Sequence, residues 1–169
     1  GVTYAMGVSS EVIEVRDGAD VPVTVRETRL GPVLDPVLDD TFGSSWALAS
    51  VLTSEVDRDT IVGMLGMMKS DSLDAFTDAL EEWRAPSVNL VAATDDGEVY
   101  YSVIGGIPVR SLASPLGGWV AQDGSTWDTA WIETIPHVVL PQVTTPEDGV
   151  VFSGNHRAAG DWYPLPLHL

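Results

Sequence analysis

Apolar residues recur three or four positions apart between Asp57 and Lys69, a spacing that predicts a helix with one buried face. The apolar residues of that expected face are Ile61, Met64, Leu65 and Met68. Gly63 and Gly66 lie in the same helix, where each costs about 1 kcal/mol relative to alanine unless it permits close packing. We interpret the methionines as core rather than as a ligand site, because methionine fills irregular space in cores.

A second helix is predicted directly after the first. Ser72 is its expected N-cap, because a serine hydroxyl can accept a hydrogen bond from a free N–H of the first turn. One face carries Leu73, Phe76, Leu80 and Trp83, and the other carries Asp74, Asp78, Glu81 and Glu82. Pro86 is expected to end this helix.

Two hairpins are predicted, and the first lies near the start of the chain. Its strands are Glu11–Arg16 and Val21–Thr28, and they flank the turn residues Asp17-Gly18. Valine alternates with polar residues in the second of these strands, a pattern typical of a half-exposed strand.

The second hairpin begins at Asn89. An apolar strand, Leu90–Thr94, follows this residue, and a second strand, Glu98–Ile104, returns beside it. The turn between them is Asp95-Asp96-Gly97, whose residues tolerate the positive φ angles of tight turns.

These elements predict an α+β fold of one domain's length, 169 residues. We divide it into a strand hairpin (1–34), a helical segment (45–86), a hairpin headed by Asn89 (87–110) and an irregular segment rich in Trp, Pro and Gly (111–169). No apolar run approaches the roughly 20 residues that span a bilayer.

The composition of the chain excludes several kinds of binding partner and site. With a formal net charge of −17, the chain is expected to bind neither nucleic acid nor membrane, because both carry negative charge. The absence of cysteine excludes disulfides, thiolate metal sites and a cysteine nucleophile. His137, His156 and His168 lack the spacing of a zinc site. Asp95 and Asp96 are interpreted as turn residues rather than as calcium ligands.

The residues from Asn89 to Tyr101 read Asn-Leu-Val-Ala-Ala-x-Asp-Asp-Gly-x-Val-x-Tyr, and Gly105 to Arg110 read Gly-x-Ile-Pro-Val-Arg. Together they resemble the penicillin amidase (penicillin acylase) family of N-terminal nucleophile hydrolases. The stretch Arg-x-Thr-Arg-Leu-Gly-Pro-Val from Arg26 is also similar, with Leu30 where the family usually has histidine. The likeness extends from about Val21 to Pro164.

This resemblance implies part of an αββα sandwich and an amide-hydrolysing activity. In the family a serine at the start of the heavy subunit is the nucleophile and its own α-amino group is the base. By the resemblance, Asn89 is an oxyanion-hole donor and Arg110 lies near the same site. Taken alone, Asn89 would be a strand-start residue bonded to nearby backbone, and Arg110 would be a surface charge.

The chain begins with Gly1 and lacks the surroundings of that nucleophile, so we expect an internal segment of the heavy subunit that is inert alone. Its expected partners are the light subunit, the rest of the heavy subunit and a small acylated amide. Open sheet edges would let the fragment associate with itself. The resemblance also implies a periplasmic or extracellular location and no cofactor, with a structural calcium as an open alternative.

A different hypothesis is an acidic α+β interaction module that binds a protein partner through its tryptophan-rich half. The residues concerned are Trp119, Trp127 and Trp131. This hypothesis requires an apolar patch around the three rings and an Asn89 side chain bonded to its own backbone. The enzyme hypothesis requires that the Asn89 side chain point into a cleft or a truncated edge, with Arg110 within several ångströms of it.

Overall fold

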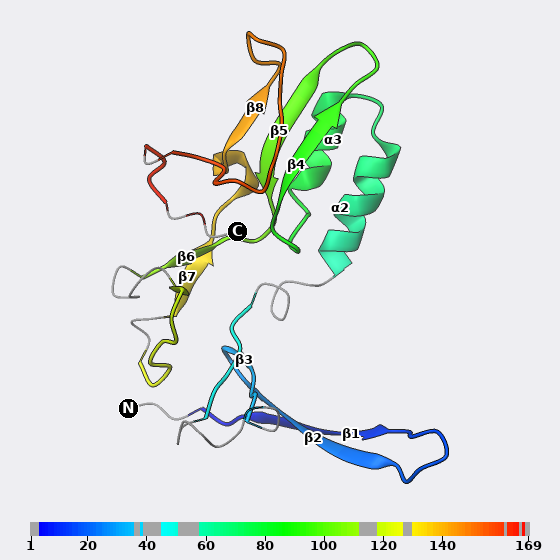
Figure 1. Ribbon diagram of the computed structural model, residues 1–169, viewed down its shortest axis with the longest axis vertical. Coiled ribbons are helices and arrows are strands. Elements are labelled where there is room, and N and C mark those ends of the chain that lie inside the picture. The colour runs from blue at the N-terminus through cyan, green and yellow to red at the C-terminus, as the bar shows by residue number, and fades with distance from the viewer. Residues whose placement is uncertain are drawn as a thin grey trace. The chain divides into compact units, whose positions relative to one another are not determined.

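The computed structural model describes residues 4–35, 38, 45–50, 58–111, 118–126, 130–160, 162–165 and 167, with residues 58 and 59 described by their backbone alone (Figure 1). The chain divides into two compact units, Gly1–Ser54 and Glu55–Leu169. Among the described residues, no helix is both long enough and apolar enough to cross a bilayer.

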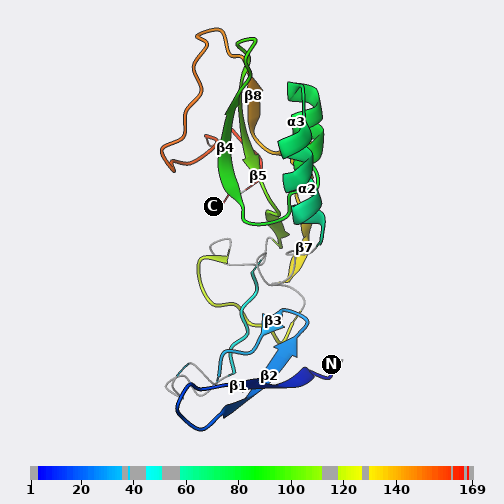
Figure 2. The ribbon, with the colours of Figure 1, turned by 90° about the vertical axis from the view of Figure 1, so that its right-hand side faces the viewer.

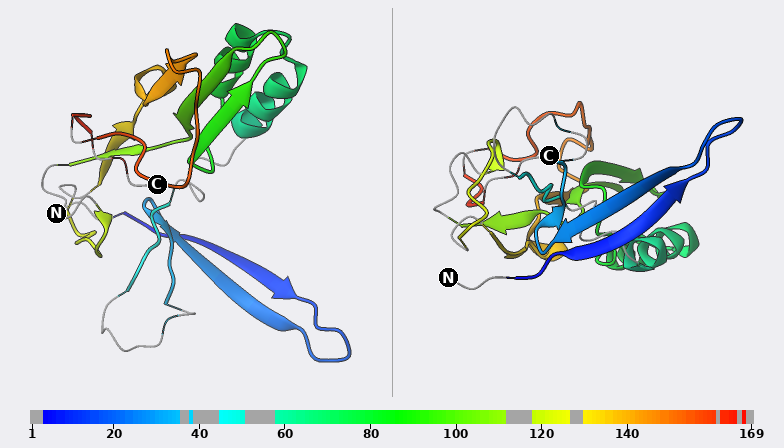
Figure 3. Two further views of the ribbon diagram at one scale, coloured as in Figure 1. Left: turned by 45° about the horizontal axis from the view of Figure 1, so that its top comes forward. Right: turned by 90° about the horizontal axis from the view of Figure 1, so that it is seen from below.

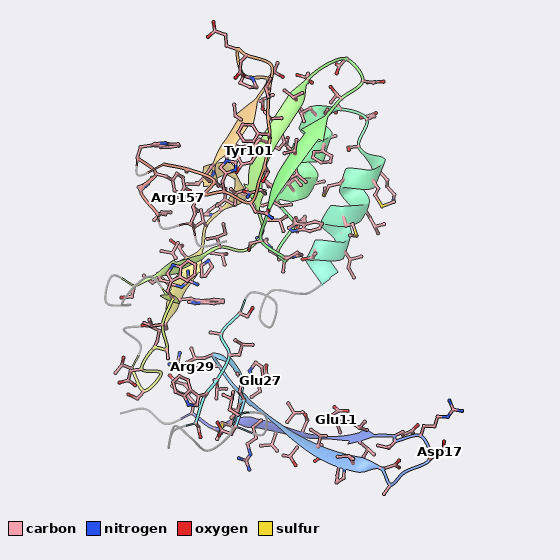
Figure 4. The ribbon with its side chains drawn as sticks, in the orientation of Figure 1. Glu11, Asp17, Glu27, Arg29, Tyr101 and Arg157 are labelled. Carbon is pink, nitrogen blue, oxygen red and sulfur yellow. The ribbon has the colours of Figure 1, made fainter. Side chains whose placement is uncertain are left out.

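The first unit is built on a long antiparallel hairpin of β1 (Gly7–Ile13) and β2 (Val21–Thr28), which Figure 3 shows as a blue ribbon. The predicted first strand, 11–16, has wrong bounds. Asp17 at the hairpin tip (labelled in Figure 4) has a left-handed φ of 61°. The backbone N–H of Val15 donates to Asp20 Oδ1 (3.4 Å), so the chain leaves the ladder after Ile13.

A tight turn joins β2 to the short strand β3 (Gly31–Pro32). The Thr28 hydroxyl donates to the Gly31 carbonyl (3.0 Å) and accepts from the Leu30 N–H (3.1 Å). The turn is therefore closed by Thr28 and backbone, and the Leu30 side chain is not needed for either bond.

The second unit contains two helices and three sheet ladders. Its helices are α2 (Arg58–Lys69) and α3 (Leu73–Leu80). A sheet of order β4-β5-β8 is formed by β4 (Val88–Ala93), β5 (Val99–Ile104) and β8 (Gln142–Thr144). A smaller sheet pairs β6 (Pro108–Arg110) with β7 (Trp131–Thr134), and the 3-10 helix η3 (His137–Val139) precedes β8.

The two helices cover one face of the β4-β5-β8 sheet, and the segment after β8 passes over the other (Figures 1 and 2). On the helix side a core cluster joins Leu73 and Leu80 of α3 to Tyr100 and Ile104 of β5. On the other side Val103 packs with Ile107, Ile135 and Leu140. Consecutive residues of β5 thus enter two different cores, as expected for a strand buried on both faces.

The structure confirms the expected α3. Its N-cap is Ser72, whose Oγ accepts from the Ala75 N–H (3.3 Å). Leu73 and Leu80 are buried, whereas Asp74 and Asp78 are exposed. The helix ends at Leu80, so Glu81, Glu82 and Trp83 lie beyond it, and the expectation that Pro86 ends the helix is wrong.

The expected buried face of α2 is wrong for the described structure. Ile61 is 61% exposed and Met68 is 77% exposed, and Met64 and Leu65 lie on the same open side. The side that packs instead carries Gly63, which is buried, and the half-buried Gly66 and Met67. A Cβ on Gly63 would lie 2.9 Å from the Ala79 carbonyl oxygen, so α2 approaches α3 through its smallest residues. Gly63 and Gly66 therefore permit close packing of α2 against α3, which was one of the two roles expected for them.

The predicted hairpin of β4 and β5 forms, with Gly97 at φ 98° in its turn, but β4 begins at Val88, so Asn89 lies within the strand rather than before it. Gly105, directly after β5, has a φ of 105° and a hypothetical Cβ would lie 2.5 Å from Ser87 Cα. This close approach brings the residues before β4 against the end of β5, which fixes where Asn89 enters the sheet.

Candidate active site

Asn89 lies in β4, directly opposite Val103 of β5. Its strand neighbours Leu90 and Ala92 pack against the core beneath the helices. Because side chains alternate along a strand, the Asn89 side chain lies on the face that is turned away from the helices. It is half-buried there.

The Asn89 side chain is held by Tyr101, which is labelled in Figure 4. The Tyr101 hydroxyl donates a hydrogen bond to Asn89 Oδ1, with an oxygen–oxygen distance of 2.8 Å. Sequence reasoning quoted Tyr101 as part of a motif but assigned it no role. The tight turn at Gly97 was the available signal, because it sets a register in which the two residues are diagonal neighbours.

This hydrogen bond determines what the amide can do. An asparagine side chain has one acceptor oxygen and one NH₂ group with two donors. With Oδ1 accepting from Tyr101, the two N–H donors of Nδ2 point elsewhere. A tyrosine hydroxyl is protonated at neutral pH and can donate, and burial raises the pKa of the Tyr101 phenol further above its ordinary value. The Tyr101–Asn89 hydrogen bond therefore leaves the uncharged NH₂ group of Asn89 as the donor of this site.

Arg110 lies at the end of β6, in the other sheet of the unit. Its guanidinium carbon is 6.0 Å from the centroid of the Trp131 ring, which is its partner in β7. Gly118 leaves room for the guanidinium, since a Cβ there would lie within 3.1 Å of Cδ and Cζ of Arg110. Burial lowers the pKa of Arg110, although an arginine stays charged at neutral pH.

Arg110 has one buried nitrogen, Nη1, that has no hydrogen-bond partner among the described residues. Buried polar groups are usually paired, so an acceptor for Nη1 is expected outside the described residues. Within the described part of the chain no hydrogen bond joins Arg110 to Asn89, and the two residues belong to different sheets.

A serine and a histidine also meet, on the helix side of the sheet. Ser102 Oγ is 3.2 Å from His137 Nε2. Desolvation lowers the pKa of His137, and the negative charge of Glu81 opposes that shift. Ser102 is 0% exposed and its Oγ also donates to the Val103 carbonyl (2.9 Å). A serine closed off from substrate is a structural group here, not a nucleophile.

The structure describes two of the three tryptophans that the interaction hypothesis names. Trp131 is half-buried against Arg110 and Trp119 is exposed, whereas Trp127 lies outside the described residues. Asn89 is bonded to the Tyr101 side chain rather than to its own backbone. Among the described residues, no group of three or more His, Asp or Glu side chains is placed to hold a metal ion.

Known proteins resemble this chain over nearly all of its length. The family model described as penicillin amidase matches residues 1–168. Penicillin acylase 2 proenzyme of a Pseudomonas species is 31% identical over 156 residues, which are 90% of this chain and 19% of that protein. Acyl-homoserine lactone acylase QuiP of Pseudomonas fluorescens is 27% identical over 164 residues, 95% of this chain and 19% of that protein.

The fold has a counterpart among solved structures. Thermostable penicillin G acylase from Alcaligenes faecalis superposes with a TM-score of 0.71 at 21% identity, over 92% of this chain and 27% of that one. This match confirms the predicted fold class, α+β and part of an N-terminal-nucleophile hydrolase sandwich. The chain spans about a fifth of the length of the curated relatives it matches.

Proposed function

Because the chain belongs to the penicillin amidase family, we propose that it supplies the oxyanion donor, Asn89, of an acylase that hydrolyses linear amide bonds. The observation that carries this proposal is the bond from the Tyr101 hydroxyl to Asn89 Oδ1. It engages the amide oxygen, and among the described residues no group accepts from either donor of Nδ2, so both can serve a substrate.

In the proposed reaction, a serine outside this chain attacks the amide carbon and its own α-amino group takes the proton. The carbonyl oxygen becomes an anion in the tetrahedral intermediate. Asn89 Nδ2–H donates to that oxygen, together with a backbone N–H elsewhere. The α-amino group then gives its proton to the leaving amine, the C–N bond of the intermediate breaks, and the acyl-enzyme that remains is hydrolysed by water.

An asparagine suits this task because its donor group is uncharged and because it is fixed on a strand. Its NH₂ donates without a formal charge, so it does not trap a carboxylate product. Removing one such donor typically costs about 10²–10³ in rate, or about 3–4 kcal/mol in the barrier. A donor fixed on a strand of a sheet also needs no reorganisation when the charge develops.

Arg110 is proposed to lie near the same site in the complete enzyme. Support comes from its buried Nη1, for which the described residues provide no acceptor, from the Trp131 ring beside the guanidinium, and from Gly118, which leaves room for it. A guanidinium offers a rigid fork of donors, which can orient the surroundings of the nucleophile.

The partners proposed for this chain are the light subunit and the rest of the heavy subunit, and the chain is expected to be inert without them. Two exposed apolar surfaces support this proposal. One is the open side of α2, which carries Ile61, Met64, Leu65 and Met68. The other is the β1–β2 hairpin, where Val8, Val12 and Ile13 are all exposed. Apolar surface of this kind usually marks an interface.

The substrate is proposed to be a small molecule with an acyl group in amide linkage. The relatives are named as a penicillin acylase and an acyl-homoserine lactone acylase, and both names describe removal of an acyl group. A periplasmic or extracellular location stays a prediction.

The test is an Asn89→Ala substitution in a full-length acylase that contains this chain. We expect kcat for amide hydrolysis to fall by about 10²–10³. Val91→Ala is the matched control, because Val91 lies on the same face of β4 two residues away and is expected to leave kcat within about twofold. Unchanged turnover by the Asn89→Ala enzyme would remove the oxyanion role.

A further inference from the structure

We propose that Tyr101 is a positioning residue for catalysis: its hydroxyl selects the orientation of the Asn89 amide that turns the NH₂ group toward the substrate oxygen. This inference rests on the proposed oxyanion role of Asn89. It assigns the tyrosine no contact with the substrate, only with Asn89.

The sheet register brings the two side chains together. Asn89 is opposite Val103, and Tyr101 is opposite Val91, so Asn89 and Tyr101 are diagonal neighbours on one face. A tyrosine is long enough to reach a diagonal neighbour. The 2.8 Å distance from the Tyr101 hydroxyl to Asn89 Oδ1 is that of an ordinary O–H···O hydrogen bond.

An amide needs such a bond because its two ends are nearly the same shape. A half-turn about the last side-chain bond exchanges oxygen for NH₂. One orientation offers donors to an oxyanion, and the other offers a carbonyl oxygen that repels it. A hydroxyl that donates to Oδ1 stabilises the first orientation. A net hydrogen bond changes such a balance by roughly 3- to 10-fold.

Tyr101 is itself held firmly. It lies in the central strand, β5, between partners in β4 and β8. Its side chain is 9% exposed, and its strand neighbours Tyr100 and Ser102 are buried in the core beneath the helices. A positioning group on a rigid, doubly paired strand keeps its hydroxyl at one place, which is the requirement for orienting a donor.

The same strand provides a matched control. Tyr100 is the next residue, is almost fully buried, and donates from its hydroxyl to Gln142 Oε1 at 2.9 Å. Its side chain lies on the helix side of the sheet, away from Asn89. A Tyr100→Phe substitution therefore removes an equivalent hydrogen bond without affecting the Asn89 amide.

The experiment compares four variants of a full-length acylase that contains this chain: Tyr101→Phe, Tyr100→Phe, Asn89→Ala, and Tyr101→Phe combined with Asn89→Ala. We expect Tyr101→Phe to lower kcat roughly 3- to 10-fold with KM within about twofold, and Tyr100→Phe to leave kcat unchanged. In the Asn89→Ala background, Tyr101→Phe should have no further effect on kcat.

The outcomes separate the two proposals. If Asn89→Ala lowers kcat 100-fold but Tyr101→Phe has no effect, or has an equal effect in both backgrounds, Tyr101 does not act through Asn89 and the positioning role is wrong. If Asn89→Ala itself leaves kcat intact, the oxyanion role is wrong instead.

A second variant decides the question if Tyr101→Phe does not fold. A fluorinated tyrosine at position 101 keeps the ring and the hydroxyl but ionises at lower pH. Its phenolate can no longer donate to Oδ1. We expect kcat of that enzyme to fall at high pH where the unmodified enzyme remains active. Identical pH profiles would overturn the positioning role.

Discussion

Gly66 of α2 faces Ala79 of α3 so closely that a Cβ added to Gly66 would lie 2.8 Å from the Ala79 Cβ. Gly63, one turn earlier, faces backbone of α3 and of the turn that follows it. The helix pair beneath the sheet thus depends on the absence of two side chains. This contact predicts that alanine at position 63 or 66 lowers the stability of the protein, whereas helix propensity alone predicts that it raises it.

Gly63→Ala and Gly66→Ala are each expected to destabilise the protein by about 1–3 kcal/mol, although alanine favours helices by about 1 kcal/mol over glycine. Combining Gly66→Ala with Ala79→Gly should recover part of the loss, because it removes the opposing Cβ. The same second change should not rescue Gly63→Ala, whose obstacle is backbone. Urea unfolding measures all of these. Stabilisation by either single alanine would show that the helices do not pack at these glycines.

Substitutions at Gly105 and Gly97 distinguish two ways in which replacing a glycine lowers stability, backbone strain and a steric clash of the new Cβ. Both have positive φ, but a Cβ on Gly105 would meet Ser87 Cα at 2.5 Å, whereas a Cβ on Gly97 would meet nothing within 4 Å. Gly97→Ala should therefore cost about 1–2 kcal/mol of backbone strain. Gly105→Ala should cost clearly more, because it also separates the chain before β4 from the end of β5. Equal losses in thermal unfolding would contradict this account.

Met67 and Met68 are adjacent, but only Met67 packs against the core between the helices and the sheet, which contains Leu80 and Tyr100. Met67→Lys is expected to destabilise the protein by about 2 kcal/mol or more. Met68→Lys should change the free energy of unfolding by less than about 0.5 kcal/mol and should reduce self-association, because it removes exposed apolar surface. Denaturant titrations and light scattering measure the two effects. A large loss of stability for Met68→Lys would mean that the open side of α2 is covered within the chain.

His137 predicts how stability depends on pH. Burial holds the pKa of this histidine below its ordinary value of 6.5, so the folded protein binds the proton less readily than the unfolded chain does. The contribution of His137 is therefore fully present above pH 6.5 and is lost as the pH falls below that value. His137→Gln should flatten the dependence of urea midpoints between about pH 7.5 and pH 5.5. Urea midpoints of His137→Gln that keep the original dependence on pH would contradict this assignment.

The sequence predicted α3 and the Asn89 hairpin well because their signals are local. Ser72 caps its own helix, and Gly97 makes the turn that joins adjacent strands. The face of α2 was predicted wrongly for the opposite reason. Apolar spacing at Ile61 and Met68 identifies a face to be covered, but it does not say which partner covers it. The close approach of Gly63 to α3 depends on tertiary packing. In the sequence, the two glycines were the only indication of which side of α2 packs.

The site was predicted only in part. Resemblance selected Asn89 and Arg110, and their functional roles stay predictions. The bond from Tyr101 to Asn89 follows from strand register, which a motif read along the chain does not display. The contact of Arg110 with Trp131 joins two strands about 20 residues apart, which no local pattern connects.

The measurement that tests the central claim most directly uses a boronic acid that adds, as a tetrahedral anion, to the proposed serine nucleophile of the full-length protein. An oxyanion donor binds that adduct much better than it binds a planar carboxylate product. We predict that Asn89→Ala weakens the boronate by about 10²–10³ while product affinity changes less than about threefold. Equal affinity for the boronate with and without the Asn89 amide would contradict the account.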